Sequence, residues 1–299
     1  MTDTSGYLVG LIGSGIGPSL SPQLHQQEAD SLGMRCLYRR LDLDGLGLPA
    51  TAIGELLAAA HLTGFDGVNI THPCKQLAVE HLDELSPDAT ALNAVNTVVF
   101  DGEKAIGHNT DRSGFARALS LGLPDADLDR VVLLGAGGAG AAVAHALAAL
   151  GAKRVHILDV DARRGAELAE AIDAHFADTH ADSTPLHGGS VPEEVLATAD
   201  GLVHATPTGM AELPGSLVAP ESLCADTWVA EVVYRPLRTE LVRIAESRGC
   251  RVLDGGRMAV FQAADAFQLF TGTEPDTARM LRRFTRLAGI ENTDNHVHS

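Results

Sequence analysis

The feature that most constrains the fold is a buried strand that runs directly into a glycine-rich loop. Residues 131–134 read Val-Val-Leu-Leu, residues 135–140 read Gly-Ala-Gly-Gly-Ala-Gly, and an alanine-rich segment continues to Leu150. A second strand, at 154–158, leads to Asp159. Strand, glycine loop, helix and a second strand ending in an acid are together typical of the first βαβ unit of a dinucleotide-binding domain.

Each glycine of the loop has a predicted task. Gly135 permits the tight turn out of the strand, Gly137 lets the backbone approach a pyrophosphate, and Gly140 lets the helix lie close to the sheet. The first amides of the helix carry a partial positive charge that suits phosphate. We therefore predict that the loop binds the diphosphate of the cofactor through Gly135, Ala136, Gly137, Gly138 and Ala139.

The acid after the second strand indicates which dinucleotide binds. A carboxylate at Asp159 would accept hydrogen bonds from both ribose hydroxyls of the adenosine half and would repel the 2′-phosphate of NADP. Arg163 and Arg164 argue the other way, because arginines at this point suit a 2′-phosphate. We favour a solvated first helical turn for the two arginines, and Arg164 remains a candidate cofactor contact. The pattern predicts NAD, with NADP less favoured.

Composition excludes several classes of function. The net charge of -17 disfavours nucleic acid and anionic membranes as partners, because both need a basic face. No apolar run approaches the ~20 residues that span a bilayer, and the first residues lack the pattern of a signal peptide. The four cysteines are scattered, and no histidine pair has the spacing of a zinc site. We expect a cytoplasmic monomer or homodimer with a small-molecule substrate and no metal.

Short apolar runs alternate with longer segments of helical period in the first half as well. Such alternation predicts βαβ units and a mostly parallel sheet, so the fold class is α/β with two domains. A domain boundary is expected close to Ser113, and the polar residues 178–190 are interpreted as a loop or helix end. The expected strands are 7–12, 36–41 and 67–70, and the expected helices are 22–32 and 50–61.

Polar residues gather at the ends of the predicted strands of the first half, where open parallel sheets bind ligands. Singly, each group has a plain structural role: Ser21 followed by Pro22 suits a helix N-cap, and Asn109 and Asp111 suit turns. Together they offer hydroxyls, amides, one cation and one carboxylate, which suit a carboxylated, polyhydroxylated substrate. The groups are 19–22, 69–73 with Lys75, 93–97 and 109–111.

The chemistry that fits these residues and a dinucleotide is oxidation of a secondary alcohol. A hydride leaves the carbon while a base removes the hydroxyl proton, and the reverse reaction needs a proton donor. Lys75 is the candidate for both directions, with Asp111 orienting it and binding a neighbouring hydroxyl. This reaction needs neither a metal nor a covalent nucleophile.

These residues resemble the shikimate and quinate dehydrogenase family over residues 8–287. The resemblance continues beyond the groups above through several motifs in the same order as in the family. They are Ala94-Val95-Asn96-Thr97, Gly107-His108-Asn109-Thr110-Asp111, the glycine loop, Ala205-Thr206-Pro207-Thr208-Gly209-Met210, Val232-Val233-Tyr234 with Pro236, and Met258 to Gln262 followed by Ala266-Phe267.

The resemblance implies roles for individual residues. Lys75 and Asp111 would be the catalytic pair, and Thr206 with Pro207 would lie against the cofactor, near which Gly255 is also expected. The substrate carboxylate would be bound by Ser19 and Ser21 with help from Tyr234. Ring hydroxyls would be bound by Thr71, Lys75, Asn96, Asp111 and Gln262. The implied domains are 1–112 with 258–290 for substrate and 113–257 for NAD, and 291–299 is expected to be a disordered tail.

The chain also departs from the usual family pattern. His204 replaces an asparagine, Phe261 replaces a frequent histidine, and Arg257 replaces a glycine common among biosynthetic members. Asp159 and residues 254–258 resemble the NAD-dependent, often catabolic branch, where a threonine frequently replaces Ser21. The resemblance thus predicts oxidation of shikimate to 3-dehydroshikimate with NAD, with quinate, oxidised to 3-dehydroquinate, as a second candidate substrate.

Other readings stay open at this point. One is a regulator that binds a dinucleotide without catalysis, although Lys75 and Asp111 argue against it. Another is a dehydrogenase for an amino-substituted shikimate analogue, which the sequence does not exclude. A folate enzyme would want aromatic stacking surface, and only 4% of the residues are aromatic. The sequence also leaves open whether the physiological direction is biosynthetic or catabolic.

Overall fold

The structure is a computed structural model that describes residues 6–289. The described residues form two compact units. The first contains the chain up to Thr110 and again from Gln262 onward, and the second contains Asp111–Phe261. The tail predicted at 291–299 lies outside the described residues.

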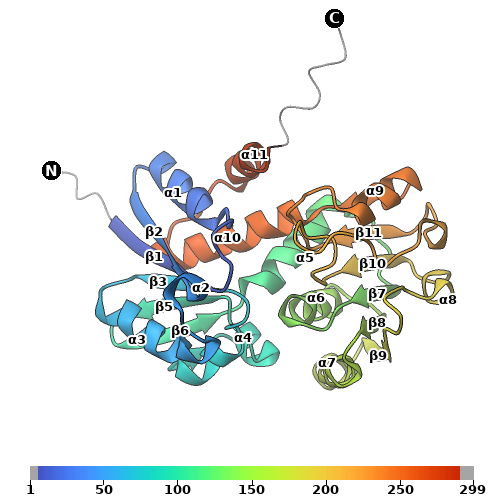
Figure 1. The fold of residues 1–299 in the computed structure, drawn as a ribbon, viewed down its shortest axis with the longest axis horizontal. Helices are drawn as coiled ribbons and strands as arrows, with labels where there is room; N and C mark the ends of the chain where they lie inside the picture. The colour runs from blue at the N-terminus through green and yellow to red at the C-terminus, as the bar shows by residue number, and fades with distance from the viewer. Residues whose placement is uncertain (1–5, 290–299) are drawn as a thin grey trace, which may run out of the picture. The chain divides into compact units, whose positions relative to one another are not determined.

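The first unit is a six-stranded sheet flanked by helices (Figure 1). The strand order is β2-β1-β3-β5-β6-β4, and β5 alone runs against its neighbours, so the predicted mostly parallel sheet is confirmed. The strands are β1 (Gly6–Gly13), β2 (Arg35–Asp42), β3 (Gly67–Ile70), β4 (Glu84–Leu85), β5 (Thr97–Asp101) and β6 (Lys104–His108). The helices are α1 (Ser21–Ser31), α2 (Leu43–Leu46), α3 (Ile53–Leu62), α4 (Pro87–Leu92) and α11 (Thr277–Leu287), and two more span the boundary between the units: α5 (Thr110–Gly122) and α10 (Gly255–Thr271).

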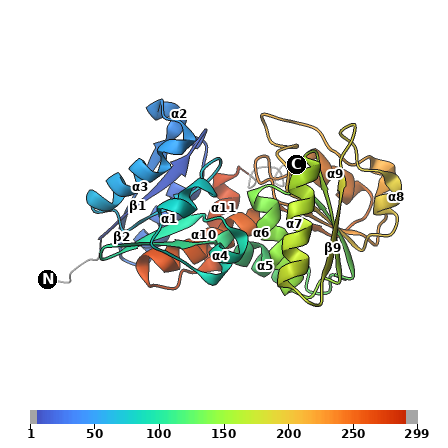
Figure 2. The same ribbon diagram turned by 90° about the horizontal axis from the view of Figure 1, so that it is seen from below.

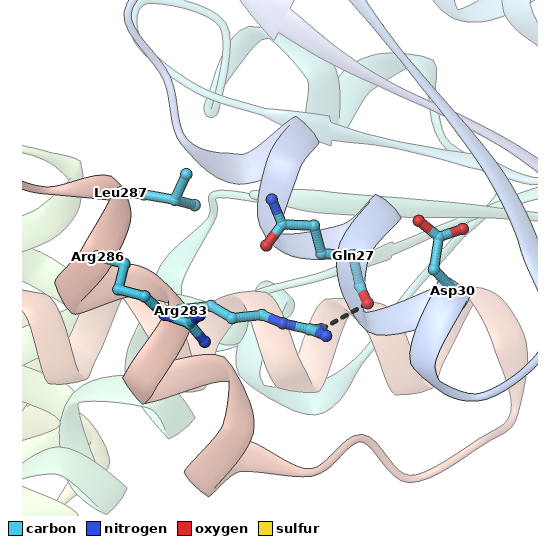
Figure 3. A pocket seen from close by; sticks show the side chains of 5 residues that line it. All are labelled: Gln27, Asp30, Arg283, Arg286 and Leu287. Atoms are coloured by element: carbon cyan, nitrogen blue, oxygen red, sulfur yellow. Dashed lines mark hydrogen bonds between the residues drawn. The ribbon is translucent and has the colours of Figure 1, made fainter.

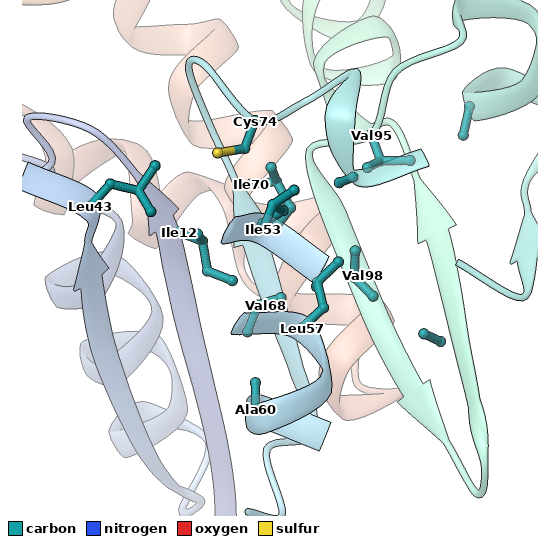
Figure 4. Packing of buried hydrophobic residues seen from close by; sticks show 13 residues of the cluster. Ile12, Leu43, Ile53, Leu57, Ala60, Val68, Ile70, Cys74, Val95 and Val98 are labelled. Carbon is teal, nitrogen blue, oxygen red and sulfur yellow. The ribbon is translucent and has the colours of Figure 1, made fainter. Parts of the chain in front are cut away.

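The central strands β1 and β3 are buried on both faces for most of their length, which is why their residues are mostly apolar, whereas the edge strand β2 is largely polar. Ile12 and Val68 face α3, where Ile53 and Leu57 complete one core cluster (Figure 4). On the opposite face, Val9, Leu11 and Tyr38 pack against Ala266 and Phe270 of α10. The last helices of the chain therefore complete the core of the unit that the first residues begin.

The second unit is a doubly wound sheet in the order β12-β11-β10-β7-β8-β9, with every pair parallel. Order reverses between β7 and β10, the switch point at which Rossmann folds bind dinucleotides. The strands are β7 (Arg130–Leu134), β8 (Arg154–Asp159), β9 (His180–Pro185), β10 (Gly201–His204), β11 (Trp228–Glu231) and β12 (Val252–Leu253). The helices are α6 (Gly138–Ala149), α7 (Ala162–His175), α8 (Glu193–Leu196) and α9 (Glu240–Ser247), and Figure 2 shows α6 and α7 side by side against the sheet.

Two local predictions were wrong. Residues 178–190, expected to be a loop or helix end, contain β9. This strand lies at the edge of the sheet and pairs only with β8, so it is less buried than a central strand and can be polar. Ser21 is not an N-cap: Leu20 holds that position without a side-chain cap, and Ser21 is the first residue of the helix. The Ser21 hydroxyl is therefore not used in capping α1.

Within residues 6–289, no helix is long and apolar enough to cross a membrane. In the same part of the chain, no three His, Cys, Asp or Glu side chains are grouped as metal ligands.

Burial of His25 in α1 predicts an acid-sensitive fold. The ring is 1% exposed, Nδ1 donates to the Ser21 carbonyl at 2.9 Å, and Nε2 has no partner. Burial lowers the pKa of His25 to about 4, although the hydrogen bond to Ser21 opposes the shift. The unfolded chain, with a pKa near ~6.5, therefore takes up the proton first, so stability falls as pH drops from about 6.5 towards 4.

We expect this histidine alone to lower the free energy of unfolding by about 2 kcal/mol between pH 7 and pH 5. Urea denaturation of the wild type and of His25→Phe at both pH values measures it, because phenylalanine fits the ring environment of Tyr38, Phe267 and Phe270 and does not titrate. An equal loss of stability in both proteins would contradict the assignment.

Candidate functional site

The predicted substrate residues of the first unit gather at one edge of its sheet, the edge formed by the carboxyl ends of β1 and β3. Ser19 follows β1, and Thr71 and Lys75 follow β3. Asn96 instead precedes β5, which corrects the expectation that this group ends a strand. Because β5 is antiparallel to β3, its first residues lie at the same edge as the carboxyl end of β3.

Asn96 is the centre of a buried polar network at this edge. Its Oδ1 accepts from the Thr110 backbone N–H at 2.8 Å and its Nδ2 donates to Thr110 Oγ1 at 2.9 Å. Asn69 donates to Thr97 Oγ1 at 3.0 Å and accepts from the Tyr38 hydroxyl at 2.7 Å. These bonds hold the loop before β5 and the first residue of α5 in one rigid arrangement.

Ser19 and Ser21 form a directed hydrogen-bond chain. The Ser21 backbone N–H donates to Ser19 Oγ, and Ser19 Oγ donates to Ser21 Oγ, each at 3.3 Å. Both side chains are only half-buried. Within this pair of serines, the Ser21 hydroxyl is therefore the one whose proton can be donated to a ligand.

Lys75 is half-buried and lies in the loop after β3. The backbone N–H of Val95 donates to the Lys75 carbonyl at 2.9 Å, which ties this loop to the segment carrying Asn96. Thr71 is held similarly, since its N–H donates to the carbonyl of Ile12 in β1 at 2.9 Å. The structure thus brings Lys75, Thr71 and Asn96 to one edge through backbone bonds.

The remaining predicted substrate residues lie on other elements. Asp111 is 7% exposed and is the second residue of α5, directly after Thr110. Gln262 is on α10, four residues before Ala266 of the first core. Tyr234 follows β11 in the second unit, and burial raises the pKa of its phenol. Lys75 and Asp111 belong to different units, so their pairing stays a prediction.

The glycine loop has the geometry that a dinucleotide needs. Gly135 has φ +98°, and a Cβ there would lie 2.7 Å from the Ala205 carbonyl oxygen. A Cβ on Gly140 would lie 1.9 Å from the Gly135 oxygen, so the first turn of α6 tolerates no side chain there. Around Gly137, the N-cap of α6, a Cβ would meet nothing within 4 Å. The space above Gly137 and the first amides of α6 fit a diphosphate.

Both carboxylate oxygens of Asp159 already accept hydrogen bonds from neighbouring residues. Oδ2 accepts from the Ala136 N–H at 2.6 Å, and Oδ1 accepts from the Asp161 N–H at 2.8 Å. Arg164 donates to both oxygens, at 2.6 Å through Nη2 and 3.3 Å through Nε. Burial acts to raise the pKa of Asp159, but the hydrogen bonds from Arg164, Ala136 and Asp161 outweigh it and leave the pKa below its ordinary value.

The two arginines after β8 therefore differ. Arg163 is exposed and pairs with Glu167 one turn along α7, as expected for a solvated first turn. Arg164 is half exposed and neutralises the buried carboxylate of Asp159. A ribose hydroxyl that bonds to Asp159 would have to share or displace this guanidinium.

A buried chain of side chains holds the predicted cofactor residue Thr206. Glu231 Oε1 and His204 Nδ1 are 2.8 Å apart, and His204 Nε2 and Thr206 Oγ1 are 2.6 Å apart. The Glu231 carboxylate also accepts from the Val233 N–H and the Thr239 hydroxyl. Nδ1 of His204 thus faces a carboxylate oxygen and Nε2 faces a hydroxyl, so the ring links Glu231 to Thr206.

Thr206 lies beside the glycine loop, since a Cβ on Gly135 would be 3.0 Å from its methyl group. Pro207 follows Thr206 and is exposed. Gly255, another predicted cofactor residue, is buried where α10 begins, and a Cβ there would lie 2.5 Å from the Val233 oxygen. Glu231 was missed by sequence reasoning, because an acid at the end of an apolar strand has no partner visible in the sequence.

A cavity of about 440 Å³ lies elsewhere on the first unit and holds none of the predicted residues (Figure 3). It is bordered by the second half of α1 and the end of α11, and Gln27 on its wall is roughly 9 Å along α1 from Ser21. The guanidinium of Arg283 already donates to the Gln27 carbonyl, Glu28 and Ser31. This cavity therefore offers less to a carboxylated ligand than the polar sheet edge does.

One unit is a doubly wound sheet with a glycine loop at its switch point, and the other carries hydroxyls and amides at the carboxyl end of its sheet. Together they define the class of two-domain dinucleotide-dependent dehydrogenases. The profile of the shikimate dehydrogenase substrate binding domain matches residues 11–98, and that of the shikimate 5′-dehydrogenase C-terminal domain matches residues 256–283. A shikimate dehydrogenase (NADP(+)) of Streptomyces avermitilis is 59% identical over 97% of this chain and 98% of its own length. The chain belongs to the shikimate and quinate dehydrogenase family, and it is an NAD(P)-dependent oxidoreductase.

Relatives with the other cofactor are also similar. A quinate/shikimate dehydrogenase (NAD(+)) of Corynebacterium glutamicum is 46% identical over 94% of this chain and 98% of its own length. The solved structure of quinate dehydrogenase from Corynebacterium glutamicum in complex with NAD superposes with a TM-score of 0.88 at 45% identity, covering 95% of this chain and all of that one. The relatives thus divide between the two cofactors.

Proposed function

We propose that this protein oxidises shikimate to 3-dehydroshikimate with NAD, and that it accepts quinate as a second substrate. The observation that carries the cofactor preference is the buried, ionised carboxylate of Asp159, whose Oδ2 accepts from Ala136 inside the glycine loop. A negative charge fixed at this position repels a 2′-phosphate and suits a ribose diol. Arg164 reduces this repulsion, so we expect a preference rather than an absolute choice.

Substrate binding follows from the polar sheet edge. The carboxylate binds at Ser19 and Ser21 with Tyr234, and the ring hydroxyls bind at Thr71, Lys75, Asn96, Asp111 and Gln262. The rigid network around Asn96 supports this assignment, because hydroxyl recognition needs hydrogen-bond groups fixed in place before the substrate arrives.

The proton-transfer step is assigned to Lys75. The bound dinucleotide supplies the acceptor for the hydride that leaves the carbinol carbon. The neutral amine of Lys75 takes the hydroxyl proton as the ketone forms, and in the reverse direction its ammonium returns that proton to the alkoxide. Asp111 positions the Lys75 amine and binds the neighbouring hydroxyl.

A comparison of NAD and NADP as co-substrates of shikimate oxidation tests the cofactor assignment. We expect kcat/KM with NAD to be at least about ten times that with NADP, since one buried charge near a 2′-phosphate contributes roughly 1–3 kcal/mol. Asp159→Asn should shift the ratio towards NADP by about 10- to 100-fold, and Arg164→Ala should shift it towards NAD. Arg163→Ala is the matched control and should leave the ratio unchanged. A wild type that prefers NADP would refute the NAD assignment.

The other readings have less support. The hypothesis of a regulator without catalysis gives no role to the hydroxyl and amide groups at the polar sheet edge. For an amino-substituted substrate, no specific feature of the described residues favours an amine over a hydroxyl. Relative rates with shikimate and quinate, measured in the same assay, determine the preferred ring.

A further inference from the structure

The side chain of Arg40 in β2 bonds to the loop between β1 and α1, which carries Ser19. This arginine has no carboxylate partner. Its Nη2 donates to the Ser19 carbonyl at 2.7 Å, and its Nε is buried with no hydrogen-bond partner. Within residues 6–289, no carboxylate lies at ion-pair distance from this guanidinium. Arg40 is therefore a half-buried cation without an ion-pair partner among the described residues.

Two other partly buried arginines of the chain differ in this respect. Arg164 pairs with Asp159 at 2.6 Å, and Arg279 pairs with the fully buried Glu28 at 2.5 Å. A cation withdrawn from water without an opposite charge lowers stability, so such an arrangement is rare unless a ligand supplies the charge. The lack of an ion-pair partner at Arg40 points to an anionic ligand.

The position of Arg40 on the sheet puts it at the edge where the substrate residues gather. In the parallel register Tyr38 is paired with Val9 and Arg40 with Leu11, so Arg40 and Tyr38 point to the same face. Tyr38 donates to Asn69 of the polar network, and Arg40 lies two residues nearer the carboxyl end of the strand. The guanidinium thus lies at the loop that carries Ser19 and Ser21.

Two side chains of β2 together clamp this loop. Asp42 Oδ1 accepts from the Gly15 N–H at 3.2 Å near the start of the loop, and Arg40 bonds to Ser19 near its end. Asp42 also accepts from the Asp44 N–H. Its carboxylate therefore bonds to backbone N–H groups and forms no ion pair with Arg40. The loop therefore has a fixed shape, with the Asp42 carboxylate near its start and the Arg40 cation near its end, beside the serines.

We propose that Arg40 is a specificity residue for the substrate carboxylate. Its charge attracts the carboxylate, and its hydrogen bond to the Ser19 carbonyl holds the loop so that the Ser19 and Ser21 hydroxyls can bind the same group. This inference rests on the proposed function, in which a carboxylated ring binds at these serines. The hydroxyls of Ser19, Ser21 and Tyr234 can donate hydrogen bonds to a carboxylate but neutralise no charge, and Ser19 already donates to Ser21. In a chain with a net charge of -17, a local cation is also what brings an anion to its site.

Kinetics with an acid and its neutral ester test the proposal. The variants are Arg40→Met, which keeps the length of the side chain, Arg40→Lys, which keeps the charge, and Arg39→Met, an exposed neighbour on the opposite face of β2. Substrates are shikimate and shikimate methyl ester, which has the same ring hydroxyls and no charge. Loss of a charge-assisted contact should raise KM for shikimate about 10- to 100-fold in Arg40→Met.

Under the proposal, the KM for the ester and for NAD stays within about threefold in Arg40→Met, Arg40→Lys is intermediate, and Arg39→Met behaves as wild type. Equal increases of KM for acid and ester would show that Arg40 only shapes the loop, and would overturn the proposal. A wild type that oxidises shikimate, together with an unchanged acid-to-ester ratio in Arg40→Met, would overturn this inference alone. A wild type without shikimate oxidation would overturn the proposed function and this inference with it.

Discussion

Replacing Lys75 with alanine is expected to lower kcat for shikimate oxidation by about 10²- to 10⁴-fold, the usual contribution of a positioned acid–base group. The amine that removes the hydroxyl proton is lost, while the glycine loop and Asp159 are untouched. The dissociation constant for NAD should therefore stay within about threefold of the wild type. Initial rates of NADH formation, together with fluorescence titration of NAD, measure both quantities.

Lys104→Ala is the matched control for this experiment. Lys104 is an exposed lysine of the same unit that pairs with Glu84 at the sheet edge farthest from β1. Its removal should leave kcat unchanged, because an ion pair at the surface contributes little to stability and nothing to the reaction. A Lys75→Ala enzyme that retained wild-type kcat would exclude this lysine as the proton-transfer group.

Much of the fold could be predicted from local pattern. The strand at 131–134, its glycine loop and Asp159 form one continuous signal, because each part needs the next to bind a diphosphate. The alternation of the first half also predicted the parallel sheet and the edge at which polar residues gather. The edge strand β9 was missed because its residues are polar and only one neighbour pairs with it.

Partners that are distant in the sequence could not be predicted in the same way. Whether Arg164 faces solvent or neutralises Asp159 depends on the side-chain rotamer at the start of α7, which the sequence alone does not determine. The Glu231–His204–Thr206 chain joins two parallel strands whose register appears only in the folded sheet. Arg40 was missed because its distinguishing feature is the lack of a carboxylate partner, and no sequence pattern records that.

The two glycines of the loop are expected to fail in different ways when alanine replaces them. At Gly140 the new Cβ would lie 1.9 Å from the Gly135 oxygen, a backbone atom that cannot easily move aside. We expect Gly140→Ala to lose at least about 3 kcal/mol of stability, despite the gain of about 1 kcal/mol that alanine normally brings to a helix interior. A large drop in the midpoint of thermal unfolding, measured without cofactor, is the expected result.

Gly137→Ala should fold normally and bind NAD poorly. The backbone there has φ -72° and ψ -172°, which alanine adopts freely, and its Cβ would enter open space. That space is where the proposed diphosphate approaches, so the methyl group should raise KM for NAD by about 10- to 100-fold, as expected when a close contact worth roughly 1–3 kcal/mol is blocked. Normal NAD binding by a stable Gly137→Ala protein would mean that the diphosphate does not contact this glycine. The pair thus separates the glycine required by the packing of α6 from the glycine reserved for the ligand.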